Sequence, residues 1–300
     1  MRLLITGSSG FIGSYVAEEA RARGHEVFPF DIKGSSRNDF RHFSAIKNAC
    51  KKAKPEAVVI HLGALPSVQQ SIKEPEVTYE TNVRGTWNVL EAARLGGARR
   101  FVFASSAAVY GTTGEEYDGK PLSEDLPLQP KNPYGLAKKI GEQMVEMWSR
   151  DTLWKNIDGV SLRFFNVFGP RQRRDSAYAT AIEKFLYQVA KKEPLTVVSP
   201  GTQRRDMVFV RDVARAVLAA AEAKKPLCGV AINIGSGANY SIQEIADIIG
   251  GKKYPRVMLP PRQGDVLEVL ADISRAKTLL NWSPEVSFEE GIKIIKKCKQ

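Results

Sequence analysis

Tyr134 and Lys138 are the two residues whose types and spacing point most directly to chemistry. They stand four positions apart, so a helix would bring both side chains to one face. A free phenol has a pKa of about 10 and is a poor base at neutral pH. A nearby ammonium and an oxidised nicotinamide would both favour the phenolate and lower that pKa. The pair therefore predicts proton abstraction by Tyr134, although the same spacing also occurs in ordinary amphipathic helices.

Two serines stand where a hydroxyl could assist this proton transfer. Ser105 and Ser106 end an apolar run and precede Ala107 and Ala108. In open α/β sheets, ligands bind at the carboxyl ends of the strands. A hydroxyl there can hydrogen-bond a substrate oxygen and relay its proton to the phenolate. We assign this role to Ser106, and we expect Ser105 to contact a cofactor or to cap the backbone.

A glycine-rich turn near the amino terminus is typical of a dinucleotide site. Thr6-Gly-Ser-Ser-Gly-Phe-Ile-Gly13 follows a predicted strand and opens a predicted helix. Gly7 would permit the tight turn, Gly10 the approach of a pyrophosphate, and Gly13 close packing of helix on strand. The first helical amides, at Phe11–Ile12, would face the phosphates. The turn therefore predicts a dinucleotide cofactor.

Acidic residues at the end of the second predicted strand and just beyond it indicate which dinucleotide binds. Asp31 follows Gly13 by 18 residues and could accept hydrogen bonds from both ribose hydroxyls while repelling a 2′-phosphate. Lys33 and Arg37 could instead accommodate that phosphate, but the carboxylate favours NAD over NADP. Asp39 is a candidate for adenine recognition, and the alternative for it is a helix-capping aspartate.

The elements that must position these residues alternate along the first half of the chain. Short apolar runs indicate parallel strands buried on both faces, at Leu3–Thr6, Val27–Asp31, Ala57–His61, Arg100–Ser105 and Gly159–Arg163. Helical stretches lie between them, at Phe11–Arg23, Ser44–Ala53, Pro75–Leu95 and Pro133–Thr152. This order predicts an α/β fold with a doubly wound parallel sheet of the Rossmann type.

Prolines interrupt this pattern beyond about Asn166, and shorter elements follow. We expect strands near Met207–Val210 and Val230–Ile234, and helices near Arg211–Glu222 and Ser241–Ile249, the last opening on a capping box. This half indicates a smaller C-terminal α/β substrate domain. We divide the chain into a NAD-binding domain, 1–165 with roughly 207–234, and a substrate domain, 166–206 and 235–300.

Composition argues against several other classes of protein. Three cysteines match no metal-ligand spacing, and with three histidines we expect no metal site. No apolar run approaches the roughly 18 residues that span a bilayer, so we expect a cytoplasmic protein without a membrane partner.

The net charge of +11 could suggest nucleic acid, but the cations lie in scattered pairs typical of helix ends. We expect no nucleic-acid partner. The alternative to an enzyme is a catalytically idle protein that senses NAD or binds nucleic acid.

Eight motifs in order resemble those of the extended short-chain dehydrogenase/reductase family, and most closely its UDP-glucose 4-epimerase group. They are Gly7–Gly13, His61-Leu62-Gly63-Ala64, Asn82–Thr86, Ser105–Gly111, Tyr134–Lys138, Arg163–Asn166, Arg205-Asp206 and Arg262–Asp265. The resemblance covers essentially the whole chain. It implies NAD as cofactor and a UDP-sugar as substrate.

The resemblance also implies roles for the later motifs. Asn166 is similar to the residue that binds the sugar-nucleotide diphosphate, and Arg205 and Arg262 are similar to its phosphate clamps. Two guanidiniums suit a pyrophosphate, which they can bind bidentately. Asp265 would contact a ribose or support the structure. For each arginine the alternative is a surface ion pair.

Further cofactor contacts are implied between the third and fourth strands. Leu62, Gly63 and Ala64 belong to a motif that borders the cofactor in the family. Asn82, in the next motif, would contribute to the cofactor site by ordering either the loop beside the cofactor or the central helix. His61 is expected to be a structural histidine rather than a catalyst.

The residues around Ser106 indicate which of the family's reactions this chain catalyses. Relatives that dehydrate or decarboxylate carry acids at this turn, whereas this chain has Ala107 and Ala108, which match the epimerases. We expect inversion at C4 of UDP-glucose or UDP-galactose. Val269 replaces a tyrosine of hexose-restricted epimerases and would leave room for N-acetylhexosamines. A 2- or 5-epimerase, a reductase or a decarboxylase on the same scaffold is the alternative.

Members of the family commonly form homodimers, and the resemblance implies the same here. Their interface is a four-helix bundle, which would be built in this chain from Pro75–Leu95 and Pro133–Thr152. Hydrophobic residues of these helices would serve either that interface or the core: Leu90, Ala93, Met144, Val145 and Trp148.

Overall fold

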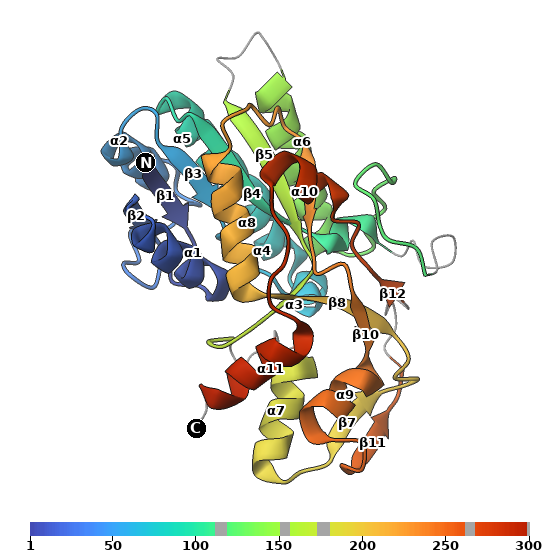
Figure 1. Ribbon diagram of the computed structural model, residues 1–300. Coiled ribbons are helices and arrows are strands. Elements are labelled where there is room, and N and C mark those ends of the chain that lie inside the picture. Colours follow the sequence, from blue (N-terminus) through green and yellow to red (C-terminus); the bar gives the residue numbers. More distant parts are fainter. Residues whose placement is uncertain (112–118, 151–156, 173–180, 262–267, 299–300) are drawn as a thin grey trace.

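A six-stranded parallel sheet forms the centre of the larger part of the molecule (Figure 1). The computed structural model describes residues 1–111, 119–150, 157–172, 181–261 and 268–298. The sheet order is β2-β1-β3-β4-β5-β9, and every neighbouring pair is parallel. Its strands are β1 (Arg2–Thr6), β2 (Glu26–Phe30), β3 (Val58–His61), β4 (Arg100–Ser106), β5 (Asp158–Phe164) and β9 (Ala231–Ile234). The predicted doubly wound fold is confirmed.

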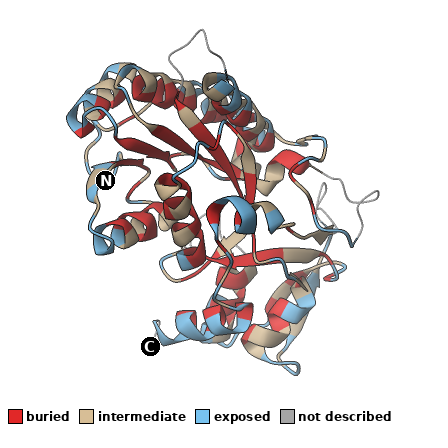
Figure 2. Ribbon diagram, turned by 45° about the horizontal axis from the view of Figure 1, so that its top comes forward, coloured by how far each residue is buried: buried red, intermediate tan, exposed pale blue. Residues whose placement is uncertain are grey.

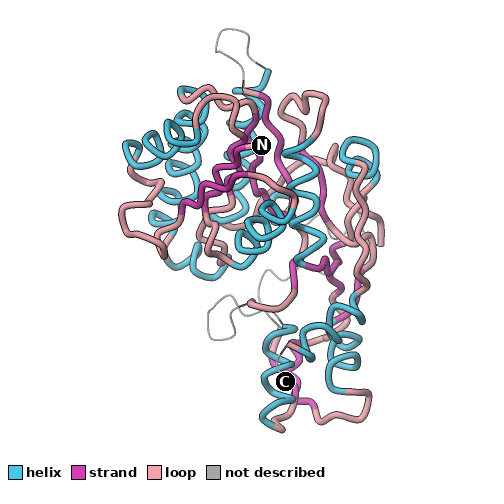
Figure 3. The backbone as a smooth tube through the Cα atoms, turned by 60° about the vertical axis from the view of Figure 1, so that its left-hand side comes forward, coloured by secondary structure: helices cyan, strands magenta, loops and turns pink. Residues whose placement is uncertain are grey.

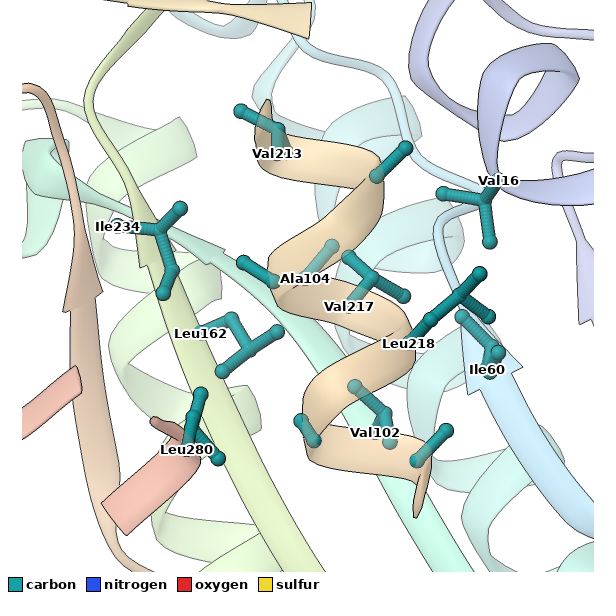
Figure 4. Close-up of a cluster of buried hydrophobic side chains, with 14 of the residues drawn as sticks. Val16, Ile60, Val102, Ala104, Leu162, Val213, Val217, Leu218, Ile234 and Leu280 are labelled. Atoms are coloured by element: carbon teal, nitrogen blue, oxygen red, sulfur yellow. The ribbon is translucent and has the colours of Figure 1, made fainter. Parts of the chain in front are cut away.

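Helices cover both faces of the sheet, which explains why its strands are apolar throughout. On one face lie α1 (Phe11–Ala22), α8 (Val210–Glu222) and α10 (Ser274–Leu280). Val213, Val217 and Leu218 of α8 belong to the apolar cluster formed with Val102 and Leu162 of the sheet (Figure 4). All of these side chains are buried, as Figure 2 shows for the sheet as a whole.

The opposite face is covered by α2 (Phe43–Ala53), α5 (Gly85–Leu95) and α6 (Pro133–Arg150). Leu90 and Ala93 of α5 and Val145 of α6 are fully buried in this layer, so they belong to the core. Met144 and Trp148 are half-buried against the same cluster. Three of the five residues considered for a subunit interface therefore have a different role.

The predicted helix at Pro75–Leu95 is not continuous. It consists of α4 (Pro75–Tyr79), a π-helical segment (Glu80–Arg84) and α5, and α3 (Val68–Lys73) precedes it. The other predicted strands and helices of the first half agree with the structure to within one or two residues, within the described ranges. A π-helical turn inside an α-helix often marks a functional position, and this one contains Asn82.

Shorter elements form the smaller part of the molecule, which carries the C-terminal helix (Figure 3). β8 (Arg204–Phe209) pairs with β6 (Asn166–Phe168), β10 (Asn239–Ser241) and β12 (Glu268–Val269), while β7 (Leu195–Val198) pairs with β11 (Arg256–Leu259). The helices here are α7 (Ala181–Lys191), α9 (Ile242–Gly250) and α11 (Phe288–Lys297). The predicted capping box of α9 is present, between Ser241 and Glu244.

The two parts are interleaved along the chain. β8 lies in the smaller set of strands, and the chain then enters α8 and β9 of the larger part. α10 packs against the main core, although its residues fall within the predicted substrate domain. Within the described residues, no helix is both long and apolar enough to cross a membrane.

Candidate active site

The carboxyl ends of the central strands and the start of α6 bring the predicted catalytic residues together. Ser106 ends β4 and caps a 3-10 turn (Ala107–Tyr110), where its Oγ accepts a hydrogen bond from the Ala108 amide at 3.2 Å. The Ser106 hydroxyl also lies close enough to the phenol of Tyr134, in the first turn of α6, to act on its pKa. The Tyr134 amide donates to Ser71 Oγ at 3.2 Å, which ties the start of α6 to α3.

Lys138 lies one turn further along α6 and is buried. Its Nζ donates to the Ala104 carbonyl at 2.7 Å and lies 4.9 Å from the centre of the Phe103 ring. The distance from Nζ to the centre of the Tyr134 ring is 5.9 Å. The spacing of the pair thus places both side chains beside the end of β4.

The pKa values of this pair differ in part from expectation. Burial raises the pKa of Tyr134 above its ordinary value, and the nearby Ser106 hydroxyl only partly opposes that rise. Burial lowers the pKa of Lys138 to about 8, against the opposing charge of Glu142. The lowered tyrosine pKa that we expect depends on bound oxidised nicotinamide, and in the protein alone burial acts in the opposite direction. The ammonium is directed at the Ala104 carbonyl rather than at the phenol oxygen.

Ser105 has a protein partner that the sequence did not suggest. Its hydroxyl donates to Glu142 Oε1 at 2.5 Å rather than to a backbone group. Glu142 is also paired with Arg163, whose Nη2 lies 2.8 Å from Oε2. Both side chains of this ion pair are at least nine-tenths buried. Ser105 therefore couples β4 to a buried ion pair behind the site.

The ion pair continues into a wider buried network. Arg163 Nη1 donates to the Tyr110 hydroxyl at 2.9 Å, and that hydroxyl donates to Asn233 Oδ1 at 2.7 Å. The Asn233 amide donates to Glu124 Oε1 at 2.9 Å. Sequence reasoning did not single out Glu142. Its position four residues after Lys138, on the same helix face, was the available indication.

The glycine turn after β1 has the shape that a dinucleotide pyrophosphate requires. Gly7 has φ +70°, and a Cβ there would lie 2.7 Å from the Gly63 nitrogen. A Cβ on Gly13 would lie 2.0 Å from the Gly7 oxygen, so the helix can approach the turn only without one. Ser8 Oγ is buried and has no hydrogen-bond partner among the described residues. The turn thus offers a close backbone approach and an unused hydroxyl, which fits NAD.

The amino terminus of α1 adds to this fit. Gly10 is its N-cap, without a side-chain hydrogen bond to the first turn, so the amides at Phe11 and Ile12 have no side-chain cap. Free amides at a helix N-terminus attract phosphate. Asp31 lies beside the turn, where its carboxylate accepts hydrogen bonds from the amides of Ser9 at 2.9 Å and Lys33 at 2.8 Å.

Asp39 is engaged within its own loop. Both carboxylate oxygens accept hydrogen bonds from the Arg41 guanidinium, the shortest at 2.6 Å, and this contact lowers the pKa of Asp39. The N-cap of α2 is His42, so Asp39 does not cap that helix. Any adenine contact by Asp39 remains a prediction.

The loop after β3, Leu62–Ala64, is held between the glycine turn and the π-helical segment. The Gly63 amide donates to Thr6 Oγ1 at 3.2 Å. Asn82 pairs with both backbone groups of Leu65: Oδ1 accepts from the amide at 2.8 Å and Nδ2 donates to the carbonyl at 2.9 Å. Asn82 thus orders the loop, as one of its two predicted roles requires.

The predicted substrate residues that the structure describes lie on neighbouring strands. Asn166 on β6 donates to the Asp206 carbonyl at 3.0 Å, and Val269 on β12 is in register with Arg205 on β8. Arg205 Nη1 donates to the Arg204 carbonyl at 2.8 Å. The two remaining candidates, Arg262 and Asp265, lie outside the described residues.

Asp206 is a second residue whose role sequence reasoning missed. Its carboxylate is fully buried, and burial raises its pKa. It accepts hydrogen bonds from the amides of Ser236 at 2.6 Å, Gly237 at 3.0 Å and Ala271 at 3.1 Å. It therefore fixes the loop after β9 and the chain after β12 beside β8.

Comparison with known proteins identifies relatives along the whole chain. The model of the NAD dependent epimerase/dehydratase family matches residues 3–235. A putative UDP-glucose 4-epimerase of Methanocaldococcus jannaschii is 33% identical, over 97% of this chain and 96% of its own length.

Solved structures agree with this assignment. The UDP-glucose 4-epimerase of Thermus thermophilus, in complex with NAD, has a TM-score of 0.87 and 31% identity, over 99% of this chain and 98% of its own. The UDP-glucuronic acid 4-epimerase of Bacillus cereus, in complex with UDP-glucuronic acid and NAD, has a TM-score of 0.84 and 30% identity, over 99% of this chain and 100% of its own.

Proposed function

Because this chain belongs to the NAD dependent epimerase/dehydratase family, we propose that it inverts C4 of a UDP-sugar, interconverting UDP-glucose and UDP-galactose. The observation that carries the proposal is that Ser106 lies beside the phenol of Tyr134 at the end of β4, with buried Lys138 one turn further along α6. The alanines at 107 and 108 add no acid to that turn. Relatives named for this activity support the choice.

The side chains divide the work as follows. Tyr134 accepts the proton of the C4 hydroxyl, and Ser106 holds the substrate oxygen and relays that proton. Burial keeps the phenol protonated in the protein alone, so its ionisation depends on the ammonium of Lys138 and on the positive charge of bound ligands. When bound, NAD would supply reversible acceptance of the C4 hydride. The turn at Gly7–Gly13 would hold its pyrophosphate.

The UDP group must stay anchored while the sugar turns over. We assign this anchor to Asn166 and Arg205, which lie on paired strands beyond the end of the sheet. Arg262 would complete a two-guanidinium clamp, and Asp265 would contact the ribose or support the clamp. Such an arrangement suits a diphosphate because guanidinium groups bind it bidentately.

Product analysis tests the reaction class. Purified protein is incubated separately with UDP-galactose, UDP-glucuronate and UDP-N-acetylglucosamine, and the products are identified by proton NMR. We expect UDP-galactose to give UDP-glucose without net oxidation or reduction. A decarboxylated or reduced product, or inversion at C2 or C5, would replace this proposal with one of the alternatives on the same scaffold.

The size of the side chain at Val269 bears on which sugars the site accepts. It packs, with Ala107, against the apolar cluster that contains Val109 and Phe165. We propose that its small size admits N-acetylhexosamines. Val269→Tyr should therefore reduce turnover of UDP-N-acetylglucosamine relative to that of UDP-glucose. An equal effect on the two substrates would refute the volume argument.

We also propose that the protein is a homodimer. Four large apolar side chains are exposed on α3, α4 and α6: Ile72, Val77, Leu136 and Met147. These helices pack together, so the exposed residues belong to one bundle. Met147→Glu should convert a dimer to a monomer in light scattering, whereas Ile294→Glu on the distant α11 should not. A wild-type monomer would exclude the proposal.

A further inference from the structure

His61 lies between three segments that border the cofactor site. The ring is 1% exposed, at the end of β3. Its Nδ1 lies 2.6 Å from Thr6 Oγ1, which precedes the glycine turn. Its Nε2 lies 3.1 Å from Thr86 Oγ1, in the first turn of α5. Both ring nitrogens are therefore engaged, one on each side.

The neighbouring hydrogen bonds determine which nitrogen carries the proton. Thr86 Oγ1 donates its one hydrogen to the Asn82 carbonyl, at 2.7 Å, so towards His61 it can only accept. His61 Nε2 must then be the donor. On the other side, Thr6 Oγ1 accepts from the Gly63 amide and keeps its own hydrogen free to donate to Nδ1.

In this arrangement each group in the series accepts a hydrogen bond from one neighbour and donates one to the next. It runs from the Gly63 amide to Thr6, from Thr6 to His61, from His61 to Thr86, and from Thr86 to the Asn82 carbonyl. The opposite tautomer would leave the Thr6 hydroxyl hydrogen and the Asn82 carbonyl without these partners. Unpaired buried polar groups are costly, so the Nε2–H form is favoured.

The surroundings of the ring also exclude its charged form. Burial lowers the pKa of His61 to about 3, and the ammonium of Lys138 on α6 acts in the same direction. The other faces of the ring meet aromatic side chains: Phe40 edge-on at 5.2 Å, and Phe101 and Phe103 at 6.0 Å between ring centres. Phe103 lies beside both the His61 ring and the Lys138 ammonium.

We propose that His61 is a positioning residue for the cofactor, held as the neutral Nε2–H tautomer so that it joins the glycine turn, the loop after β3 and the π-helical segment into one unit. Each segment carries a different motif to which the family resemblance assigns a cofactor role: Gly7–Gly13, Leu62–Ala64 and Asn82. The side chain of Asn82 closes the unit, because it pairs with both backbone groups of Leu65. This one-way chain of hydrogen bonds restricts the relative placement of the three segments.

Nitrogen-15 NMR of the histidine side chains tests the tautomer directly. The chain has three histidines, so His25→Gln and His42→Gln variants assign the His61 resonances. We expect the Nε2–H pattern in the wild type, without titration between pH 5 and 8. An Nδ1–H pattern, a mixture of tautomers or a titration in that range would overturn the proposal.

A threonine pair tests whether this chain of hydrogen bonds positions the cofactor. Thr86→Val removes the acceptor of the His61 proton, and it should raise the Kd for NAD about tenfold and shift the His61 tautomer. Thr78→Val is the control. Thr78 is equally buried and its hydroxyl donates to the carbonyl four residues earlier, at 3.1 Å, but it does not contact His61. Equal effects of the two variants on NAD affinity would contradict the proposal. Neither measurement requires sugar turnover, so a different sugar reaction would leave the result intact.

Discussion

The cofactor side and the catalytic side of the sheet edge are held by two different kinds of buried network. On the cofactor side, uncharged groups form a series of hydrogen bonds, which we call the neutral chain. Its members are Thr6, His61, Thr86 and the Asn82 carbonyl. On the catalytic side the charged cluster centres on an ion pair and includes Ser105, Tyr110, Glu124, Glu142, Arg163 and Asn233. Lys138 is coupled to both networks, since it acts electrostatically on His61 and is acted on by Glu142.

This difference has consequences for how each side can fail. A neutral hydrogen bond contributes about 1 kcal/mol net, so the neutral chain can lose one bond at a time. A buried ion pair that loses one member leaves an uncompensated charge, which costs about 3–5 kcal/mol. The catalytic helix should therefore be held in an all-or-none manner, while the cofactor turn should weaken in steps.

The largest expected effect is that of breaking the ion pair. Glu142→Gln leaves Arg163 charged and buried, so the free energy of unfolding should fall by about 3–5 kcal/mol in urea denaturation. Glu146→Gln is the matched control one turn later on α6, because its pair with Arg150 is exposed, and it should cost at most about 1 kcal/mol. Similar losses in the two variants would remove the distinction between the networks.

A smaller effect is expected from acid on the neutral chain. The pKa of His61 is about 3 in the fold and about 6.5 in an unfolded chain, so between these values only the unfolded chain binds the proton. Stability is then complete above about pH 6.5 and falls as pH decreases, by about 2 kcal/mol at pH 5. Lys138 is the charged group that faces the ring and strengthens this trend.

Unfolding measured at a series of pH values checks this contribution. His61→Gln should flatten the acid slope, whatever its effect on stability at neutral pH. His42→Gln alters an exposed histidine and should leave the slope as in the wild type. If the slope is the same with and without His61, the ring is not held in its neutral form.

The smallest effect concerns the contact between β4 and the charged cluster. Ser105→Ala removes the donor to Glu142 but leaves the ion pair, so the loss in stability should be about 1.5 kcal/mol. Ser161→Ala on β5 is the control, because the buried Ser161 hydroxyl has no hydrogen-bond partner among the described residues. Its removal should be neutral or stabilising in thermal unfolding. A larger loss from Ser161→Ala would contradict the role given to Ser105.

The sequence predicted the frame of the site because its cues are local. The glycine turn, the order of strands and helices and the Tyr134–Lys138 spacing all depend on residues close together in the chain. The break in the predicted helix at Pro75–Leu95 was missed, because Glu80–Arg84 contains no proline or glycine that would indicate a π-helical turn.

Properties that depend on distant segments could not be predicted in this way. Glu142 and Arg163 meet across two elements, and Asp206 gathers amides from two other segments. The raised pKa of Tyr134 in the protein alone could not be predicted, because burial outweighs the effect of the Ser106 hydroxyl, and burial is a tertiary property. For the same reason Leu90, Ala93 and Val145 belong to the core rather than to a subunit surface.

The central claim is that Tyr134 carries the chemistry while a separate region holds the cofactor. Tyr134→Phe tests it when NAD binding is measured by calorimetry and turnover of UDP-galactose by NMR on the same preparation. We predict that turnover falls by at least about a hundredfold, while the Kd for NAD stays within about twofold of the wild type. Turnover close to that of the wild type would contradict the assignment of Tyr134, and loss of NAD binding would contradict the separation of the two regions.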